Sequence, residues 1–255
     1  MPFVTTKKIL NAFLPPEEFH LIVVYAPLGY GKSAYSIKVM VEVLMEVYNM
    51  RKKEAWEKVK QFIFFHPQQF LDKLEQIKES GLKRVPGLIW DDAGLWCYAL
   101  EWWDPLLIAI GKYLNVARTR LACLICTTPT PAWIFKKLRK FPQAINIKIL
   151  KRDSPRVNEN GEEQEDFVKR WSRLARAYLH WTTPDMKKSG VRRIYEDEFL
   201  CYLPDSFYSW YKPLRDAYEQ LALNLIREEL HKIGKKSKAI LLENYPELTV
   251  PKIIL

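Results

Sequence analysis

The segment from His20 to Ser33 constrains the fold of this 255-residue chain more than any other. It begins with the apolar run HLIVVY, which is bounded by prolines on both sides and is typical of a buried β-strand. The run leads directly into APLGYGKS, and a helical pattern follows to about Met50. Small residues at a strand-to-helix turn let the backbone wrap a phosphate group and direct its N–H groups at it. The spacing therefore predicts a phosphate-binding loop, with alanine in place of the usual first glycine.

The residues of this loop predict how a nucleotide would bind. Lys32 is expected to reach the β- and γ-phosphates, and Ser33 to bind Mg²⁺. The N-terminus of the following helix adds positive potential at the same place. The expected nucleotide-binding residues are Ala26, Pro27, Leu28, Gly29, Tyr30, Gly31, Lys32, Ser33 and Ala34. The alternative is a tight turn that holds these residues by chance.

A second candidate element is a pair of carboxylates at the end of an apolar run. Leu88–Trp90 is followed directly by Asp91 and Asp92. Ligands of parallel α/β sheets bind beyond the carboxyl ends of the strands, so these side chains are expected beside the phosphate-binding loop. We assign Asp91 to the metal ion and Asp92 to activation of the attacking water. The alternative for Asp92 is a cap of the following helix.

Two further residue types complete the candidate catalytic set. The apolar run that starts at Leu121 ends in Thr127, which is predicted to contact the γ-phosphate or the attacking water, or else to cap a helix that starts near Thr130. Arginines often meet the charge that develops on a transferred phosphoryl group. Arg139 is the first candidate for this role, and Arg118 and Arg120 are the alternatives.

The alternation of short apolar runs with helical patterns predicts a three-layer α/β fold with a mainly parallel, five-stranded sheet. A C-terminal hairpin and helices are expected after it. We predict a core over residues 1–152, a polar loop over 153–168 and a C-terminal extension packed on the core over 169–255. The expected strands cover 20–25, 61–65, 84–90, 121–126 and 144–150; expected helices cover 95–114, 130–140 and 204–232; and the hairpin covers 171–195.

The net charge of +10 and a pI near 9.3 suggest a polyanionic partner. The stretch from Lys136 to Arg156 contains eight basic residues and one acidic residue, and it is the predicted DNA-binding patch. No apolar run is long enough to span a bilayer, and the N-terminus lacks the features of a signal peptide. Cys123 and Cys126 have metal-site spacing, but a strand would point them to opposite faces, so we do not assign them to a metal.

Four segments carry a resemblance to a known family: VYAPLGYGKSAYS, IFFHPQQFLDKLEQI, VPGLIWDDAGLWCY and ARTRLACLICTTPTP. Together they resemble P-loop ATPases encoded by crenarchaeal viruses and plasmids, including fuselloviruses of Sulfolobus, which have been compared with AAA+ ATPases and the initiator DnaA. The resemblance covers about residues 20–150, and WDDAG is its most specific part. It implies ATP as the nucleotide and action in the host cytoplasm. Residues 171–218 instead resemble the ends of Zot-like and FtsK/HerA-like ATPases.

These observations predict an oligomeric ATPase that acts on DNA in replication initiation, partition or remodelling. A DNA packaging or export motor of the FtsK/HerA or Zot type is the alternative within the same class. A small-molecule or nucleotide kinase would use the same loop but requires an acceptor pocket and usually an arginine-rich lid. A slowly hydrolysing nucleotide-dependent switch is the third alternative, because aspartate at position 92 has a shorter reach than glutamate.

Overall fold

The computed structural model describes residues 2–101, 103–139, 141–142, 144–151, 170–182 and 189–232. It divides into two compact units, residues 1–203 and residues 204–255. The helices of the first unit are α1 (Val4–Phe13), α2 (Lys32–Tyr48), α3 (Lys52–Val59), α4 (Pro67–Glu79), α5 (Pro105–Tyr113) and α6 (Lys136–Arg139). Its strands are β1 (His20–Tyr25), β2 (Ile63–Phe64), β3 (Leu88–Trp90), β4 (Cys123–Thr128), β5 (Ile145–Lys151), β6 (Ser172–Thr182) and β7 (Ser189–Leu200).

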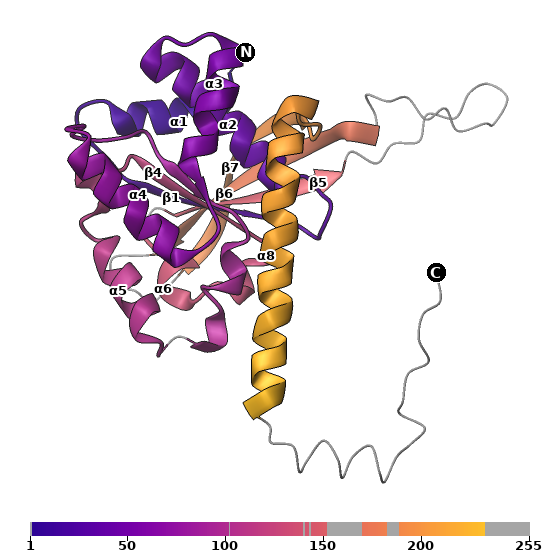
Figure 1. Cartoon of the computed structure of the whole chain (residues 1–255). Coiled ribbons are helices and arrows are strands. Elements are labelled where there is room, and N and C mark those ends of the chain that lie inside the picture. The colour runs from indigo at the N-terminus through magenta and orange to yellow at the C-terminus, as the bar shows by residue number, and fades with distance from the viewer. Residues whose placement is uncertain are drawn as a thin grey trace, which may run out of the picture. The chain divides into compact units, whose positions relative to one another are not determined.

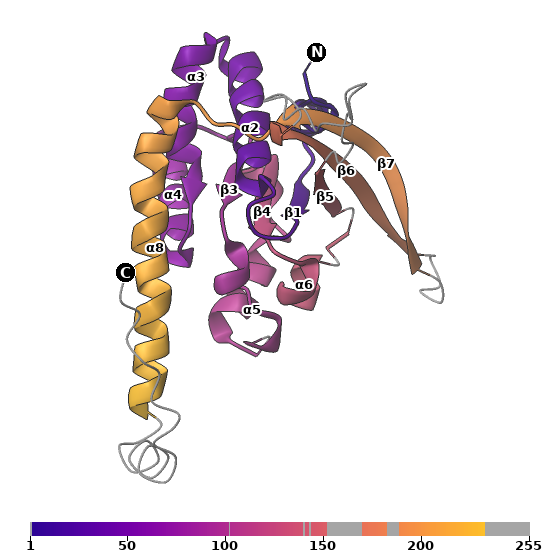
Figure 2. The same ribbon diagram turned by 90° about the vertical axis from the view of Figure 1, so that its right-hand side faces the viewer.

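The seven strands form one sheet with the order β2-β3-β4-β1-β5-β6-β7. Figure 2 shows β3 to β7 from left to right in this order. The pairings among the first five strands are parallel, whereas β6 pairs antiparallel with both β5 and β7. The structure therefore confirms the mainly parallel α/β fold, and it places β4 between the loop strand β1 and the aspartate strand β3.

The C-terminal hairpin is a correction to the prediction of a five-stranded sheet. β6 is hydrogen-bonded to β5 over the whole length of that strand, from the Ile145–Leu179 pair to the Lys151–Arg173 pair. The hairpin thus continues the central sheet as a long curved ribbon at its edge (Figure 2). The predicted boundary at residue 152 falls between two paired strands, and the predicted loop at 153–168 lies outside the described residues. The three-part division of the chain stays a prediction.

Helices cover both faces of the sheet. A Cβ atom on Gly87 would lie 3.0 Å from the Met40 Cε, so α2 packs on the face to which Gly87 and Ile89 point. Trp90 points to the other face, where Phe70 of α4 stacks on it with ring centroids 6.2 Å apart. Figure 1 shows α1, α2 and α3 in its upper part, α4 at the left, and α5 and α6 below α4. These layers bury β1, β3 and β4 completely or nearly so.

Two predicted helices are much shorter in the structure. The region 95–114 contains the 3₁₀ helices η2 (Ala93–Leu95) and η3 (Ala99–Glu101), and then α5, which starts at Pro105. Asp104 caps α5 through a 2.6 Å bond from the Leu106 N–H, and proline favours the first helical position, so the helix starts here and not earlier. The region 130–140 likewise splits into η5 (Pro131–Trp133) and α6.

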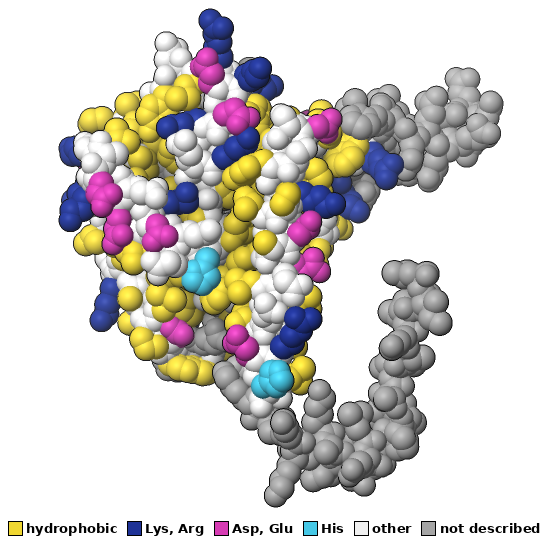
Figure 3. Space-filling view, in the orientation of Figure 1, with side chains coloured by type: hydrophobic (Ala, Val, Ile, Leu, Met, Phe, Trp, Pro, Cys, Tyr) yellow, Lys and Arg dark blue, Asp and Glu magenta, His cyan; other side chains and the backbone are white. Residues whose placement is uncertain are grey.

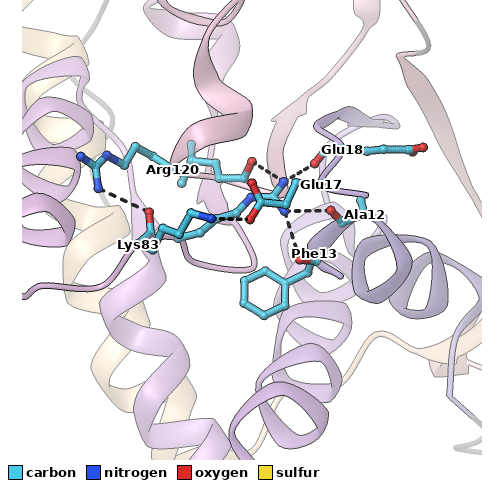
Figure 4. Close-up of polar contacts among 8 residues, drawn as sticks. Ala12, Phe13, Glu17, Glu18, Lys83 and Arg120 are labelled. Atoms are coloured by element: carbon cyan, nitrogen blue, oxygen red, sulfur yellow. Dashed lines mark hydrogen bonds and ion pairs between the residues drawn. The ribbon is translucent and has the colours of Figure 1, made fainter. Parts of the chain in front are cut away.

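Arg84 anchors the end of α1 to the sheet. Its guanidinium Nη1 donates to the carbonyls of Ala12 (2.9 Å) and Phe13 (3.1 Å), which belong to the last turn of α1 and lack intrahelical partners. Its Nη2 donates to the carbonyls of Glu18 and of Leu121, which precedes β4 (Figure 4). Burial lowers the pKa of Arg84 from its ordinary value. One buried cation thus satisfies backbone groups from three segments.

The second unit contains the helix α8 (Asp205–Lys232), which confirms the predicted helix over 204–232. Its start is marked by Pro204, whose carbonyl accepts from the N–H groups of Phe207 and Tyr208. Pro213 lies inside the helix. Within the part of the chain that the structure describes, no helix has the length and apolarity needed to cross a membrane.

Candidate functional site

The predicted phosphate-binding loop has the backbone conformation that its glycines favour. β1 ends at Tyr25 and α2 begins at Lys32. Gly29 and Gly31 have positive φ angles of 78° and 91°, which side chains other than glycine rarely adopt. Gly31 is the residue that precedes α2, and no side chain caps this helix. The N-terminal N–H groups of α2 therefore remain directed toward the loop, where an anion can accept from them.

Lys32 folds back over this loop. Its Nζ donates to the carbonyls of Ala26 (3.1 Å) and Pro27 (3.3 Å), and its side chain is buried. The ammonium group is thus held at the mouth of the loop by the backbone that would surround a phosphate. A phosphate oxygen would offer it a stronger, charge-assisted bond than either carbonyl does.

Ser33, Asp91 and Thr127 form one hydrogen-bonded cluster. The Asp91 Oδ1 accepts from the Ser33 Oγ (2.8 Å) and from the Thr127 Oγ1 (2.6 Å). Asp91 is 1% exposed and Thr127 is fully buried. The three residues come from the first turn of α2, the end of β3 and the end of β4, which meet at one edge of the sheet. The structure therefore brings together three residues that the sequence assigned to the metal ion and the phosphate.

Asp92 sits beside this cluster in an unusual backbone conformation. Its φ is +50°, and its N–H donates to the Thr127 Oγ1 over 2.8 Å. Its side chain makes no capping bond to η2, so the structure does not support the capping alternative. Gly94, two residues later, lies against β4, since a Cβ atom there would approach the Thr128 Oγ1 to 2.8 Å. The aspartate pair is thus fixed to the end of β4 by close backbone contacts.

The alternative role for Thr127 was to cap a helix that starts near Thr130, and in the structure Thr130 itself is the cap. The Thr130 side chain caps η5 by accepting from the Ala132 N–H, and the Thr128 Oγ1 donates to the Thr130 carbonyl over 3.0 Å. Thr127 itself bonds to the aspartate pair. The position of Thr127 therefore agrees with the predicted role near the γ-phosphate, which stays a prediction.

Arg139 lies apart from the cluster. It ends α6, and two residues later the Phe141 ring meets the Phe19 ring at 5.7 Å. Phe19 precedes β1, so this turn lies toward the amino ends of the parallel strands, whereas the loop lies at their carboxyl ends. Arg118 and Arg120 precede β4, so they too lie at the amino ends of the strands. The Arg120 Nη1 donates to the Lys83 carbonyl (Figure 4). Within the described residues, no hydrogen bond or ion pair joins any of these three arginines to the loop of its own chain.

The predicted basic patch does not form one surface among the described residues. Lys148 and Lys151 lie three positions apart on β5 and point to opposite faces of the sheet. The Lys151 Nζ lies 4.9 Å from the centre of the Tyr30 ring in the loop, whereas Lys136 and Lys137 are exposed on α6. Basic and acidic side chains are interspersed on the face drawn in Figure 3. Lys140, Arg152 and Arg156 lie outside the described residues.

One loop contact was not predicted from the sequence. A Cβ atom on Gly31 would lie 2.6 Å from the Cys201 Cβ, so the segment after β7 packs directly on the loop. Burial raises the pKa of the Cys201 thiol and keeps it neutral. Gly31 and Cys201 are separated by 169 residues, and no local sequence pattern predicts their contact, which depends on the antiparallel pairing of β5, β6 and β7.

Substitution of Gly31 by alanine should destabilise the chain by about 2–3 kcal/mol, because a positive φ and a clash with Cys201 act together. Urea unfolding measures this cost. Gly81→Ala is the matched control, since Gly81 also has a positive φ (71°) but an added Cβ meets nothing within 4 Å; it should cost about 1 kcal/mol. The double variant with Cys201→Gly should recover part of the loss. Equal costs at both glycines would contradict the contact.

Comparisons with known proteins agree with the virus-type resemblance in part. No protein-family model matches the chain. The protein B-251 of Sulfolobus spindle-shape virus 1, whose function is uncharacterized, is 26% identical over 232 residues, which is 89% of this chain and 86% of that protein. The chain is homologous to a spindle-shaped virus protein.

Two solved structures are similar to this chain at 13% identity. The KaiC-like protein PH0186 of Pyrococcus horikoshii OT3 has a TM-score of 0.34 and is matched over 70% of this chain and 89% of that one. The genome packaging NTPase B204 of Sulfolobus turreted icosahedral virus 2, solved with ATP-γS, has a TM-score of 0.35 and is matched over 71% of this chain and all of that one.

Proposed function

We propose that this chain binds ATP with Mg²⁺ and hydrolyses it, and that hydrolysis is coupled to work on DNA for an archaeal virus or plasmid. The observation that carries the proposal is the cluster of Ser33, Asp91 and Thr127 directly beside the loop that holds Lys32. The loop supplies phosphate donors, and the cluster supplies metal ligands and a polar group for the γ-phosphate. A turn that held the loop residues by chance would not meet an aspartate and a threonine from two other strands.

The residues present fit a magnesium ion. The Ser33 Oγ and the Asp91 Oδ1 are oxygen donors that lie 2.8 Å apart and belong to the start of α2 and the end of β3. The described residues contain no group of three or more histidine, cysteine or acidic side chains that could hold a metal by themselves. The pair of Ser33 and Asp91 suits Mg²⁺, since this ion is held by few protein ligands together with waters and substrate phosphates. When bound, the ion would neutralise charge on the phosphates.

The chain's own residues divide the catalytic work. Lys32 and the N–H groups of the loop would bind and orient the β- and γ-phosphates. Asp92 would accept the proton of the attacking water, and the Thr127 hydroxyl, which accepts from the Asp92 N–H, fixes the backbone of that aspartate. The left-handed backbone of Asp92 is a strained feature of the kind found at functional sites.

Arg139 would serve a neighbouring subunit. It lies away from the loop of its own chain, so a contribution to the γ-phosphate requires a second copy. Oligomerisation is therefore part of the proposal. DNA is the proposed partner because of the basic composition of the chain. On the ribbon of β6 and β7, two arginines, Arg176 and Arg193, both pair with Glu196.

Steady-state ATP hydrolysis by the purified full chain tests the proposal, with and without Mg²⁺ and with and without single- and double-stranded DNA. We expect Mg²⁺-dependent hydrolysis that DNA stimulates. Asp92→Asn should lower the rate by about 10²- to 10⁴-fold, the usual range for loss of a general base. Asp104→Asn is the matched control, because Asp104 caps α5 and asparagine caps equally well.

The outcomes separate the parts of the proposal. Neither nucleotide binding nor hydrolysis in any condition would overturn it. Hydrolysis that DNA leaves unchanged would contradict only the action on DNA. Tight ATP binding with very slow turnover would contradict the DNA motor and favour the nucleotide-dependent switch.

A further inference from the structure

The loop lies between two different groups of strands. Asp91, directly after β3, and Thr127, near the end of β4, lie on one side of β1, and β5, β6 and β7 lie on the other side. In a bound nucleoside triphosphate, the metal ion and the γ-phosphate would be at the Asp91 end. The sugar and the base must then extend away from Asp91. The geometry directs them toward the ends of β5 and β7 and the start of β6.

This second side of the loop is built by three contacts. The Lys151 Nζ at the end of β5 lies 4.9 Å from the Tyr30 ring centre. Cys201 packs on Gly31, and the Cys201 N–H donates to the Trp171 carbonyl over 2.8 Å. Tyr202 directly follows Cys201 in the chain and Trp171 is hydrogen-bonded to Cys201, so both aromatic residues adjoin the residue that packs on the loop.

Trp171 and Tyr202 form an aromatic pair at this position. Their ring centroids lie 6.1 Å apart and their planes are at 82°, so the edge of one ring meets the face of the other. Tyr202 is 39% exposed and Trp171 is half-buried. An edge-to-face pair with exposed ring surface presents a flat π face on which a nucleobase can stack.

The surroundings of this pair are basic. The charges that act on the Cys201 thiol are those of Arg173, Lys38 and Lys151, which come from β6, α2 and β5. Arg173 is 7% exposed, and its Nη1 donates to the carbonyls of Arg170 and Ser172. Positive charge between the loop and the aromatic pair suits a ligand whose phosphates begin at the loop and whose base lies beyond them.

We propose that Trp171 and Tyr202 form the base subsite of the nucleotide site and select purine nucleotides. This inference rests on the proposed nucleotide-binding function. Stacking responds to the area of a base and not to the hydrogen-bonding groups on its edge. The two-ring purines should therefore bind more tightly than the one-ring pyrimidines, and ATP and GTP should bind alike.

Calorimetric titration of the full chain with Mg²⁺ complexes of ATP, GTP, UTP and inorganic tripolyphosphate tests the subsite. Trp171→Ala and Tyr202→Ala should each weaken ATP binding about tenfold and leave tripolyphosphate binding within about twofold. Trp181→Ala is the matched control, because Trp181 is 44% exposed near the far end of β6, about 33 Å from Trp171, which directly precedes that strand. This control should change neither ligand. Lys32→Ala should weaken both.

Failure of the subsite and failure of nucleotide binding give different results. If wild-type protein binds neither ATP nor tripolyphosphate, the proposed function fails. If it binds both and the aromatic variants bind ATP as tightly as wild type does, the subsite alone is overturned. Equal weakening of ATP and tripolyphosphate by Trp171→Ala would show that Trp171 supports the loop through Cys201, and would also overturn the subsite. Tyr202→Ala keeps the test valid if Trp171→Ala does not fold, since Tyr202 is the more exposed ring.

Discussion

Replacement of Lys32 by alanine should reduce ATP hydrolysis by about 10²- to 10³-fold or more, a loss typical of removing one preorganised charge-stabilising donor. The ammonium group is buried at the mouth of the loop, where its attraction for a phosphate is stronger than in water. Alanine retains the helix that starts at this position, since it has the highest helix propensity. The expected defect is therefore in phosphate binding and not in the fold. Phosphate release and thermal melting measure the two separately.

Two further variants sharpen this prediction. Lys32→Arg should also fail, because the planar guanidinium is longer and cannot occupy the place of a compact ammonium between the carbonyls of Ala26 and Pro27. Lys53→Ala on α3 is the control, since Lys53 is an exposed lysine outside the site, and it should hydrolyse ATP like wild type. An active Lys32→Ala protein would show that this loop does not bind the reacting phosphates.

Sequence reasoning located most of the candidate site because its signals are local. The loop follows β1 without interruption, and Asp91 and Thr127 were each placed at the end of an apolar strand. Parallel strands bring their carboxyl ends to one edge, so the cluster of these residues with Ser33 followed from topology. The loop conformation followed equally from Gly29 and Gly31.

The features that sequence reasoning missed depend on contacts between distant segments. Nothing near Cys201 indicates that it packs on Gly31, because this contact requires two antiparallel pairings at the edge of the sheet. The hairpin was expected outside the sheet for the same reason. The predicted helix over 95–114 was too long for a local reason. Its apolar pattern continues through Asp104 and Pro105, whereas Asp104 caps a helix that starts only at Pro105.

Removal of the Asp197 side chain on β7, outside the candidate site, should strongly destabilise the fold. Its carboxylate is 5% exposed and accepts from the N–H groups of Val4 (2.7 Å) and Thr5 (3.2 Å), from the Thr5 hydroxyl (3.0 Å) and from the Tyr35 hydroxyl (2.6 Å). The first turn of α1 contains no acidic residue and has no side-chain cap of its own. A carboxylate from the far end of the chain therefore caps α1 and joins it to α2 and β7.

Asp197→Ala should lower the free energy of unfolding by about 3–5 kcal/mol, because it leaves several buried donors without an acceptor. For a chain of this size the melting temperature should fall by roughly 10 °C. Tyr35→Phe removes one donor together with its hydroxyl and should cost only about 1 kcal/mol. Asp104→Ala, which removes an exposed cap from α5, should cost a similar amount.

The same contacts predict how stability changes at high pH. The pKa of Tyr35 lies well above its usual value of 10.0. Burial is the larger cause, and the neighbouring Asp197 carboxylate is the next. The folded chain therefore keeps the phenol proton where the unfolded chain loses it, so the stabilisation is complete below pH 10 and decreases as the pH rises above it. Urea unfolding at pH 8 and pH 10.5 should show a smaller decrease for Tyr35→Phe than for wild type. An equal decrease in both proteins, together with a cost of Asp197→Ala no larger than that of Asp104→Ala, would show that this network does not hold α1 in place.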